Sequence, residues 1–248
     1  MINFSAISNN SLIGKFLRGI LKLVPKNLIL PILQGRLKGK KWVIGSGAFG
    51  YWLGTYELEK QKFFEKVVKK DDVVYDIGAN VGFYTLLASE LIGPNGRVFA
   101  FEPLPRNIFY LKKHIKLNKL NNIAIIEAAV SDKKGVLNFS EYESNATGRL
   151  GKEGQLKVSS VVLDDLLKDG KILPPNVLKI DVEGAEAEVL KGAGDILSKH
   201  RPDIFLSIHD KRDFNDYFDF FKKLGYNLRS VTDRNMRETG EVFVSFNK

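Results

Sequence analysis

Short apolar runs alternate with amphipathic helical patterns along most of the chain, and this alternation restricts the fold more than any other feature. The apolar runs have the length of strands, and the segments between them repeat apolar residues at helical spacing. Such an order is typical of a mostly parallel sheet with helices on both faces. The sequence therefore predicts an α/β protein, and 248 residues are enough for one such domain of ordinary size.

The pattern also gives the approximate bounds of the predicted elements. A glycine-rich and aromatic stretch, residues 40–57, is expected to form short strands or loops over the domain. Strands are predicted at 73–77, 97–101, 123–129, 177–181, 203–209, 228–231 and 241–246, with a hairpin edge at 135–142. Helices are predicted at 57–69, 82–92, 105–118, 185–199 and 214–224. The stretch from Glu143 to Lys157 has neither pattern, and we expect a loop there.

Positive charge is concentrated at the N-terminus. The net charge is +9, yet no Asp or Glu precedes Glu57, and the first 56 residues contain eight lysines and arginines. Residues 12–24 place apolar side chains on one helical face and basic side chains on the other. We therefore expect two parts, a basic amphipathic extension over residues 1–45 and the α/β domain over residues 46–248.

Two interpretations of residues 12–24 stay open. The segment is a helix packed on the domain or on a second subunit of a homo-oligomer, or it is an interfacial helix in peripheral contact with an anionic membrane. Charges and prolines interrupt it too often for a membrane span, and nothing resembling a nucleic-acid recognition motif accompanies it. The chain has no cysteine, which excludes disulfides and thiolate sites and fits a cytoplasmic protein.

The turn after the strand at 73–77 is the natural candidate for a ligand site. Ligands of open parallel sheets bind at the carboxyl ends of the strands, where the strand order reverses. The turn contains Asp76, Gly78, Asn80 and Gly82, but these do not form the G-x-G-x-x-G fingerprint of dinucleotide sites, and the phosphate loop is absent as well. An acid at the strand end would repel a phosphate and favour a cationic ligand.

The next two strand ends suggest the rest of that ligand. Glu102 lies at the tip of the neighbouring strand, where a carboxylate can accept hydrogen bonds from both hydroxyls of a ribose. One strand further on, Ala129, Val130 and Ser131 lie where an adenine ring could rest. These sites together predict an adenosine with a positively charged, phosphate-free tail, and S-adenosylmethionine is such a molecule.

Six segments in the same order, GTYE, DIGANVGFYT, FAFEPLPRN, AAVSDKKG, LDDLL and LKIDVEGAEAEVLKGA, resemble the FkbM family of S-adenosylmethionine-dependent methyltransferases. The resemblance covers about Trp52 to His209. It implies the class I methyltransferase fold, a Rossmann-like sheet of seven strands with the last strand antiparallel. It also implies methyl transfer, usually to a hydroxyl of a sugar or other natural product. With the positions that the resemblance adds, the predicted cofactor site consists of Tyr56, Glu57, Asp76, Gly78, Asn80, Gly82, Glu102, Pro103, Ala129, Val130, Ser131 and Asp181.

Transfer to an alcohol needs a general base or a metal, because a hydroxyl is a poor nucleophile. Asp181 and Glu183 follow one buried strand and His209 follows the next, so we predict these three as catalytic residues. His209 or Asp181 would take the acceptor proton, and Lys179 is expected to pair with one of the two acids. As an alternative, the three residues bind a divalent metal that lowers the pKa of the hydroxyl. A third interpretation has the acids only capping the following helix, and His114 is expected to be structural.

The leading prediction is an O-methyltransferase acting on a saccharide, glycolipid or related natural product. The alternatives are a nitrogen or small-metabolite acceptor, an NAD-dependent oxidoreductase, and a non-catalytic module of the same fold. The acceptor is expected under residues 143–157 and around Tyr51 and Trp52. Arg149 would there reach an acidic group on the acceptor.

Overall fold

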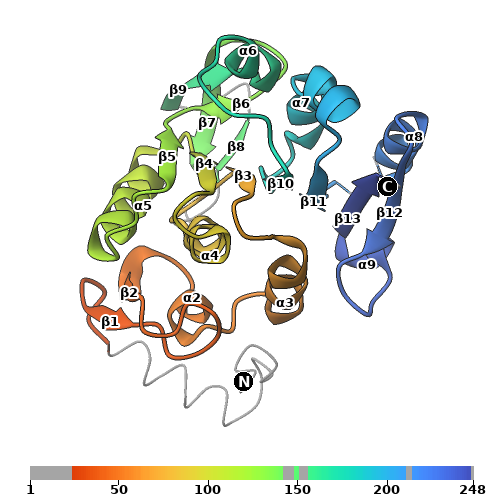
Figure 1. Cartoon of the computed structure of the whole chain (residues 1–248). Helices are drawn as coiled ribbons and strands as arrows, with labels where there is room; N and C mark the ends of the chain where they lie inside the picture. Colours follow the sequence, from red (N-terminus) through yellow and green to blue (C-terminus); the bar gives the residue numbers. More distant parts are fainter. Residues whose placement is uncertain (1–23, 142–147, 151–155, 211–213, 247–248) are drawn as a thin grey trace.

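The computed structural model describes residues 24–141, 148–150, 156–210 and 214–246. At residues 139–141 and 148–150 it describes the backbone alone. Residues 12–23 of the expected amphipathic helix therefore lie outside the described part. A seven-stranded sheet with helices on both faces forms the centre (Figure 1). In the described ranges, no helix is long and apolar enough to cross a bilayer.

The main sheet has the order β12-β13-β11-β10-β3-β4-β5. The bounds of these strands are Tyr226–Ser230, Glu241–Phe246, Asp203–Ser207, Val177–Ile180, Val73–Ile77, Arg97–Phe101 and Ile123–Ile126. All neighbours are parallel except that β13 is antiparallel to both β11 and β12. The implied class I methyltransferase arrangement, with the last strand antiparallel, is confirmed. The order reverses between β3 and β10, and this places the ligand-binding edge at their carboxyl ends.

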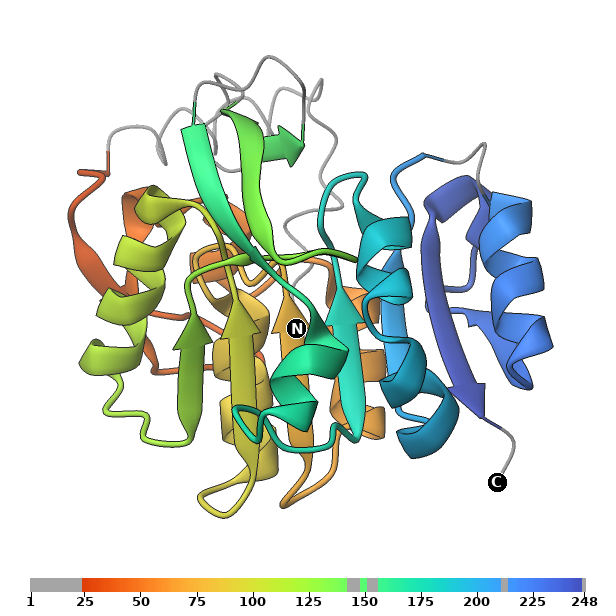
Figure 2. The ribbon, with the colours of Figure 1, turned by 90° about the horizontal axis from the view of Figure 1, so that it is seen from above.

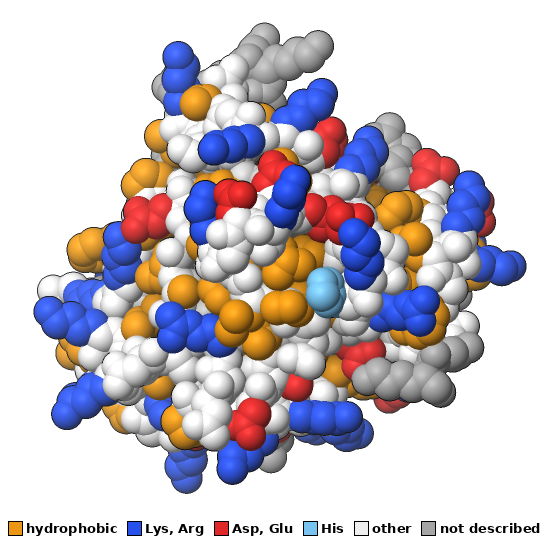
Figure 3. Space-filling view, turned by 45° about the horizontal axis from the view of Figure 1, so that its top comes forward, with side chains coloured by type: hydrophobic (Ala, Val, Ile, Leu, Met, Phe, Trp, Pro, Cys, Tyr) orange, Lys and Arg blue, Asp and Glu red, His pale blue; other side chains and the backbone are white. Residues whose placement is uncertain are grey.

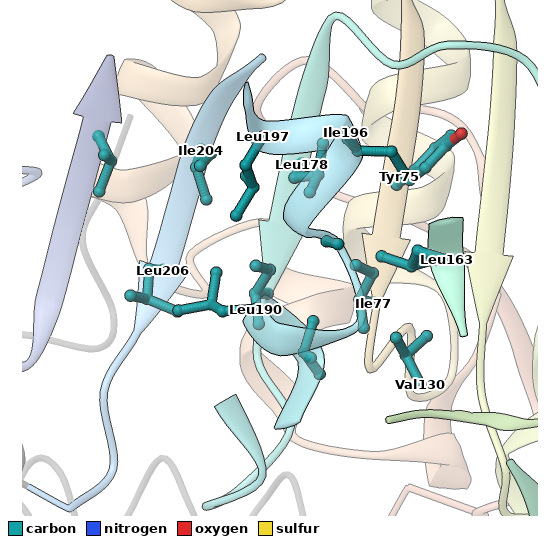
Figure 4. Close-up of a cluster of buried hydrophobic side chains, with 14 of the residues drawn as sticks. Tyr75, Ile77, Val130, Leu163, Leu178, Leu190, Ile196, Leu197, Ile204 and Leu206 are labelled. Carbon is teal, nitrogen blue, oxygen red and sulfur yellow. The ribbon is translucent and has the colours of Figure 1, made fainter. Parts of the chain in front are cut away.

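Helices cover both faces of the sheet because the strands are apolar on both sides. The main helices are α3 (Leu58–Val67), α4 (Phe83–Ile92), α5 (Pro105–Leu117), α6 (Leu163–Lys168), α7 (Glu186–Lys191) and α8 (Phe214–Lys223). Figure 4 shows one of the two large apolar clusters, in which Leu178 and Ile204 of the sheet meet Leu190 and Leu197. All four residues of β10 are buried, as expected for a central parallel strand.

A short hairpin of β1 (Ile29–Pro31) and β2 (Lys41–Val43) is attached to α5 through His114. The Val43 N–H donates to Nε2 of His114 (3.1 Å), and Nδ1 of His114 contacts the Val81 carbonyl (2.8 Å). The ring of Trp42 stacks on the imidazole at 3.8 Å. Burial lowers the pKa of His114 to about 4, so the imidazole is neutral and structural, as predicted. The expected loops at 40–57 also contain a short helix, α2 (Phe49–Leu53).

A second sheet corrects the prediction for residues 123–161. The predicted strand at 123–129 is two strands, because β5 ends at Ile126 and β6 (Ala129–Val130) leaves the main sheet. β6 joins a four-stranded sheet of order β6-β9-β7-β8 (Figure 2), with β7 at Gly135–Glu141, β8 at Gly148–Leu150 and β9 at Leu156–Val161. The expected loop at 143–157 thus contains β8 and the start of β9. The hairpin edge predicted at 135–142 is confirmed as β7, which pairs with β8 and β9.

One predicted helix and one predicted strand were longer than the elements found in the structure. The predicted helix at 185–199 ends as α7 at Lys191 and is followed by a π-helical turn at Ile196–His200. Gly192 is the C-cap residue of α7, and a Cβ there would lie 2.2 Å from the Ser131 carbonyl oxygen. The predicted strand at 203–209 ends at Ser207, so His209 lies in the loop that follows β11.

Basic and acidic side chains are interspersed over the face seen in Figure 3.

Candidate active site

A cavity of about 280 Å³ opens at the carboxyl ends of β3, β4 and β10. It also reaches the turn before α3 and the start of β6. Most residues of the predicted cofactor and catalytic sites line it together. These are Tyr56, Glu57, Gly78, Asn80, Glu102, Pro103, Ala129, Val130, Asp181, Glu183 and His209.

Gly78 joins the turn after β3 to the end of β10. Its φ is +77°, and a Cβ at this position would lie 1.9 Å from the carbonyl oxygen of Asp181. No L-amino acid side chain fits there without displacing backbone. The missing side chain therefore lets the cofactor turn and the predicted catalytic strand end approach each other.

Glu102 is fixed at the tip of β4 by three donors. Oε2 accepts the Asn80 N–H (2.7 Å), while Oε1 accepts the Leu104 N–H (3.0 Å) and the Asn107 side-chain amide (3.2 Å). The side chain is buried, and burial raises its pKa against the effect of these hydrogen bonds. The arrangement gives a preorganised carboxylate on the cavity wall, where the ribose contact is predicted.

Three predicted cofactor residues do not line the cavity. Asp76 lies buried beneath it, accepts a hydrogen bond from the Thr85 hydroxyl (2.6 Å), and is 3.3 Å from Nζ of Lys179. Gly82 lies against α5, where a Cβ would approach Leu111 to 2.5 Å. The Ser131 N–H donates to Val161 between strands. The predicted contact of Asp76 with a cationic ligand is thus replaced by an internal ion pair.

Lys179 connects the two central strands. Its Nζ lies 3.3 Å from Asp76 and 3.4 Å from Asp181, and it donates to the Gly78 carbonyl (3.2 Å). The predicted pairing with an acid after the strand is confirmed for Asp181. Burial opposes the charge of Lys179, but Asp76 and Asp181 raise its pKa above the usual value. Burial likewise opposes the charge of Asp181, and Lys179 and Lys60 nevertheless lower the pKa of Asp181 to about 2.

His209 is oriented by a residue that the sequence interpretation missed. Its Nδ1 lies 2.6 Å from Oε1 of Glu186, a buried carboxylate that also accepts the Gly184 N–H (3.0 Å). The other nitrogen, Nε2, lies 3.5 Å from Asp181 and 3.4 Å from Glu183. The hydrogen bond to Glu186 raises the pKa of His209, against the effect of burial. In the sequence, Glu186 could have been suspected as a site residue only because it closely follows the two predicted acids, Asp181 and Glu183.

Asp181, Glu183 and His209 also meet the spacing of a metal site. One ligand atom from each of the three lies within 4.8 Å of the others. Glu183 adopts the left-handed conformation, with φ of +56°, and burial raises its pKa. The geometry is compatible with both the base and the metal interpretation.

A second group of charges lies on the wall formed by α3, α4 and β13. The ammonium of Lys60 is buried and lies 2.7 Å from Glu241, 3.4 Å from Glu57 and 2.7 Å from the Ser207 hydroxyl. The Tyr84 hydroxyl donates to Glu57 (3.0 Å). Glu241 and Tyr84 were not predicted, because nothing in the final strand or in α4 distinguishes them from ordinary helix and strand residues.

Among the charged residues that line the cavity, acids outnumber bases. Five carboxylates face Lys179 and His209, and the five are Glu57, Glu102, Asp181, Glu183 and Glu241. Lys179 is already paired with Asp76 and Asp181, and the buried Lys60 is paired with Glu57 and Glu241, so carboxylates remain in excess after both lysines are counted. The cavity therefore favours a ligand that brings positive charge.

Aromatic rings complete the wall beside α2. Tyr51 and Tyr56 approach to 4.4 Å between ring centroids, and Phe83 packs against both. Tyr51 lines the cavity as expected, whereas the Trp52 indole N–H donates to the Pro31 carbonyl (3.0 Å). Most of the expected acceptor loop at 143–157, and the side chain of Arg149, lie outside the described residues.

Residues 76–228 match the family model described as the methyltransferase FkbM domain. The chain is 32% identical to the hexuronic acid methyltransferase AglP of Haloferax volcanii over 131 residues, which cover 52% of this chain and 53% of AglP. It is 27% identical over 153 residues (54% and 62% of the two chains) to the 2-O-methyltransferase NoeI of Sinorhizobium fredii. The chain thus spans about half the length of these curated relatives. The crystal structure of a methyltransferase FkbM from Methylobacillus flagellatus covers 80% of this chain and 53% of its own, with a TM-score of 0.49 and 17% identity.

Proposed function

Because the chain belongs to the FkbM family of S-adenosylmethionine-dependent methyltransferases, we propose that it methylates a hydroxyl of a saccharide, glycolipid or related natural product. The oriented pair of His209 and Glu186 beside a preorganised cofactor cavity carries this proposal. The relatives named for hexuronic acid and for 2-O methylation support an oxygen acceptor of the saccharide class.

The cofactor follows from the sequence of groups along the cavity. Ala129 and Val130 offer an apolar surface for adenine, and the fixed carboxylate of Glu102 suits the ribose hydroxyls. The amino-acid tail would run along Gly78 and Asn80. S-Adenosylmethionine carries a sulfonium and an ammonium, which suit the excess of carboxylates around the cavity.

The reaction is an in-line displacement at the methyl carbon. The acceptor oxygen forms a bond to that carbon while the carbon–sulfur bond breaks, and S-adenosylhomocysteine leaves as a neutral thioether. In our proposal Nε2 of His209 takes the hydroxyl proton. Glu186 fixes the other ring nitrogen as the N–H donor and stabilises the imidazolium that forms. Asp181, paired with Lys179, lies at the strand end between the base and the cofactor turn.

Calorimetric titration with S-adenosylmethionine, S-adenosylhomocysteine and NAD tests the cofactor assignment. We expect both adenosyl ligands to bind and NAD not to bind. Glu102→Ala should weaken binding about tenfold or more, because it removes hydrogen bonds to a charged group. Glu127→Ala, which removes a half-exposed acid paired with Lys112, is the matched control and should bind normally. Binding of NAD in place of the adenosyl ligands would refute the proposal.

Transfer of a labelled methyl group then tests the acceptor class. A panel of neutral sugars, uronic acids, amino sugars and simple amines, offered with labelled cofactor, separates oxygen from nitrogen acceptors. We expect the label to appear as a methyl ether. A methylated amine as the sole product would replace the hydroxyl acceptor while leaving the cofactor assignment intact.

A further inference from the structure

Exposed apolar side chains gather in one short segment of the described chain. Leu28, Ile29 and Leu33 are exposed by 40%, 38% and 46%. The described residues include three more large hydrophobic side chains this exposed, Phe109, Val136 and Leu173, and these are isolated from one another in the sequence. Within the described residues, the hairpin segment is therefore the place where exposed large apolar side chains are close together in the sequence.

Exposed basic side chains belong to the same segment. Lys26, Arg36, Lys38 and Lys41 are exposed, and no acid occurs in the sequence before Glu57. Lys40 forms an ion pair with Glu90 (2.7 Å) and is not counted. We call the exposed residues of this segment the hairpin face, namely Lys26, Leu28, Ile29, Leu33, Arg36, Lys38 and Lys41.

The chemistry of the hairpin face fits a lipid surface better than a protein. An interfacial membrane contact combines apolar side chains that enter the acyl boundary with lysines and arginines that meet anionic headgroups. The cores of protein interfaces, in contrast, are depleted in lysine. Three of the four exposed cations of the hairpin face are lysines.

The hairpin face is also joined to the wall of the cavity. The Leu33 N–H donates to the Trp52 carbonyl (3.1 Å), and the Trp52 indole donates back to Pro31 (3.0 Å). Tyr51, the next residue, lines the cavity. Figure 1 shows β1 at the periphery of the molecule with α2 beside it. A surface bound to the hairpin face would therefore lie close to the aromatic wall of the site.

We propose that the hairpin face docks the protein on an anionic phospholipid surface. Apolar insertion by Leu28, Ile29 and Leu33 and headgroup contact by the four cations would act together. The inference is independent of the methyl-transfer proposal, because it concerns binding alone.

Sedimentation of the full chain with phospholipid vesicles tests the docking. We expect binding to vesicles that contain phosphatidylglycerol, weak binding to pure phosphatidylcholine, and loss of binding in high salt. Two variants address the face, the triple change Leu28→Ser, Ile29→Ser, Leu33→Ser and the quadruple change of Lys26, Arg36, Lys38 and Lys41 to Gln. Each should weaken binding by about tenfold or more. The double variant Phe109→Ser, Leu173→Ser removes exposed apolar side chains elsewhere and should bind as the wild type does.

Four results would overturn the proposal. They are no binding of the wild type, equal binding to neutral vesicles, binding that both face variants retain, and a wild-type dimer that the triple variant converts to a monomer. The last result, measured by analytical ultracentrifugation, would assign the face to a second copy of the chain. Circular dichroism of each variant shows that the fold is intact, so that a loss of binding is attributable to the face.

Discussion

At the scale of single residues, His209 has one nitrogen fixed and the other directed at the cavity. The buried carboxylate of Glu186 engages Nδ1, and Nε2 lies between Asp181 and Glu183. A base needs this asymmetry, because one tautomer must leave a lone pair available. Nothing comparable is found for His114, whose two nitrogens are both engaged by backbone groups.

Replacing His209 should reduce turnover far more than cofactor binding. His209→Ala is expected to lower kcat by about 10²–10⁴-fold, the usual contribution of a positioned base. The affinity for S-adenosylhomocysteine should stay within about threefold, because a base is not needed to bind the product. Steady-state kinetics and calorimetry measure the two quantities. A loss of kcat below tenfold would remove His209 from the base role.

The same histidine predicts the acid limb of the pH profile. The neutral imidazole is the active form, so kcat/KM should fall as the pH drops through the pKa of His209, which lies above 6.5. The hydrogen bond to Glu186 is the largest cause of that upward shift. In Glu186→Gln the limb should therefore move to lower pH, with a lower plateau. An unchanged limb would show that another group titrates.

We expect activity to persist after metal removal. Lys179 lies 3.4 Å from Asp181, so the carboxylate already has a cationic partner, and this opposes a second cation beside it. Dialysis against EDTA should leave kcat unchanged, and added Mg²⁺ or Mn²⁺ should not raise it. If EDTA abolished activity and Mg²⁺ restored it, Asp181, Glu183 and His209 would be metal ligands, and the base would have to be another residue.

At the scale of elements, the site depends on the close packing of the turn after β3 against the end of β10. Gly78 after β3 meets the Asp181 carbonyl after β10. Gly78→Ala should destabilise the fold by more than about 3 kcal/mol, because both strain and backbone displacement contribute. Gly170→Ala is the matched control, since Gly170 has φ of +67° with open space around it and should lose only about 1–2 kcal/mol. Urea unfolding measures both; equal losses would refute the steric account.

His114 links the N-terminal hairpin to α5, and its protonation should weaken that link. Its pKa is about 4 in the fold and 6.5 as the ordinary value, so the unfolded chain binds the proton more readily. Stability is fully present above about pH 7 and falls as the pH drops toward 4. Between pH 8 and pH 5 the loss should be about 2 kcal/mol from this residue. His114→Gln, though less stable overall, should lose correspondingly less over the same range.

At the scale of the whole molecule, the sequence predicted the main sheet better than the second one. Each strand of the main sheet is a local apolar run bounded by turns, so all seven were found. In the second sheet, β7 was predicted as a hairpin edge, whereas β6 and β8 have only two and three residues and leave almost no periodic signal.

The candidate site was predicted in composition but not in orientation. Glu102, Asp181 and His209 were found because they follow strands whose ends meet at one edge. Asp76 was assigned to the ligand, yet its side chain lies beneath the cavity on Lys179. Glu186 and Glu241 were missed because their roles depend on contacts between elements that the sequence does not place side by side.

The chain leaves the main sheet after β5, forms the second sheet and rejoins the main sheet only at β10, on the other side of β3 and β4. β6 and β9 run parallel, with Ala129 opposite Ser160 and Val130 opposite Val161. The excursion between them therefore begins and ends on adjacent hydrogen-bonded strands. Because the two ends of residues 131–159 are held side by side, a change in the length of this segment need not move the strands that end at Glu102 and Asp181.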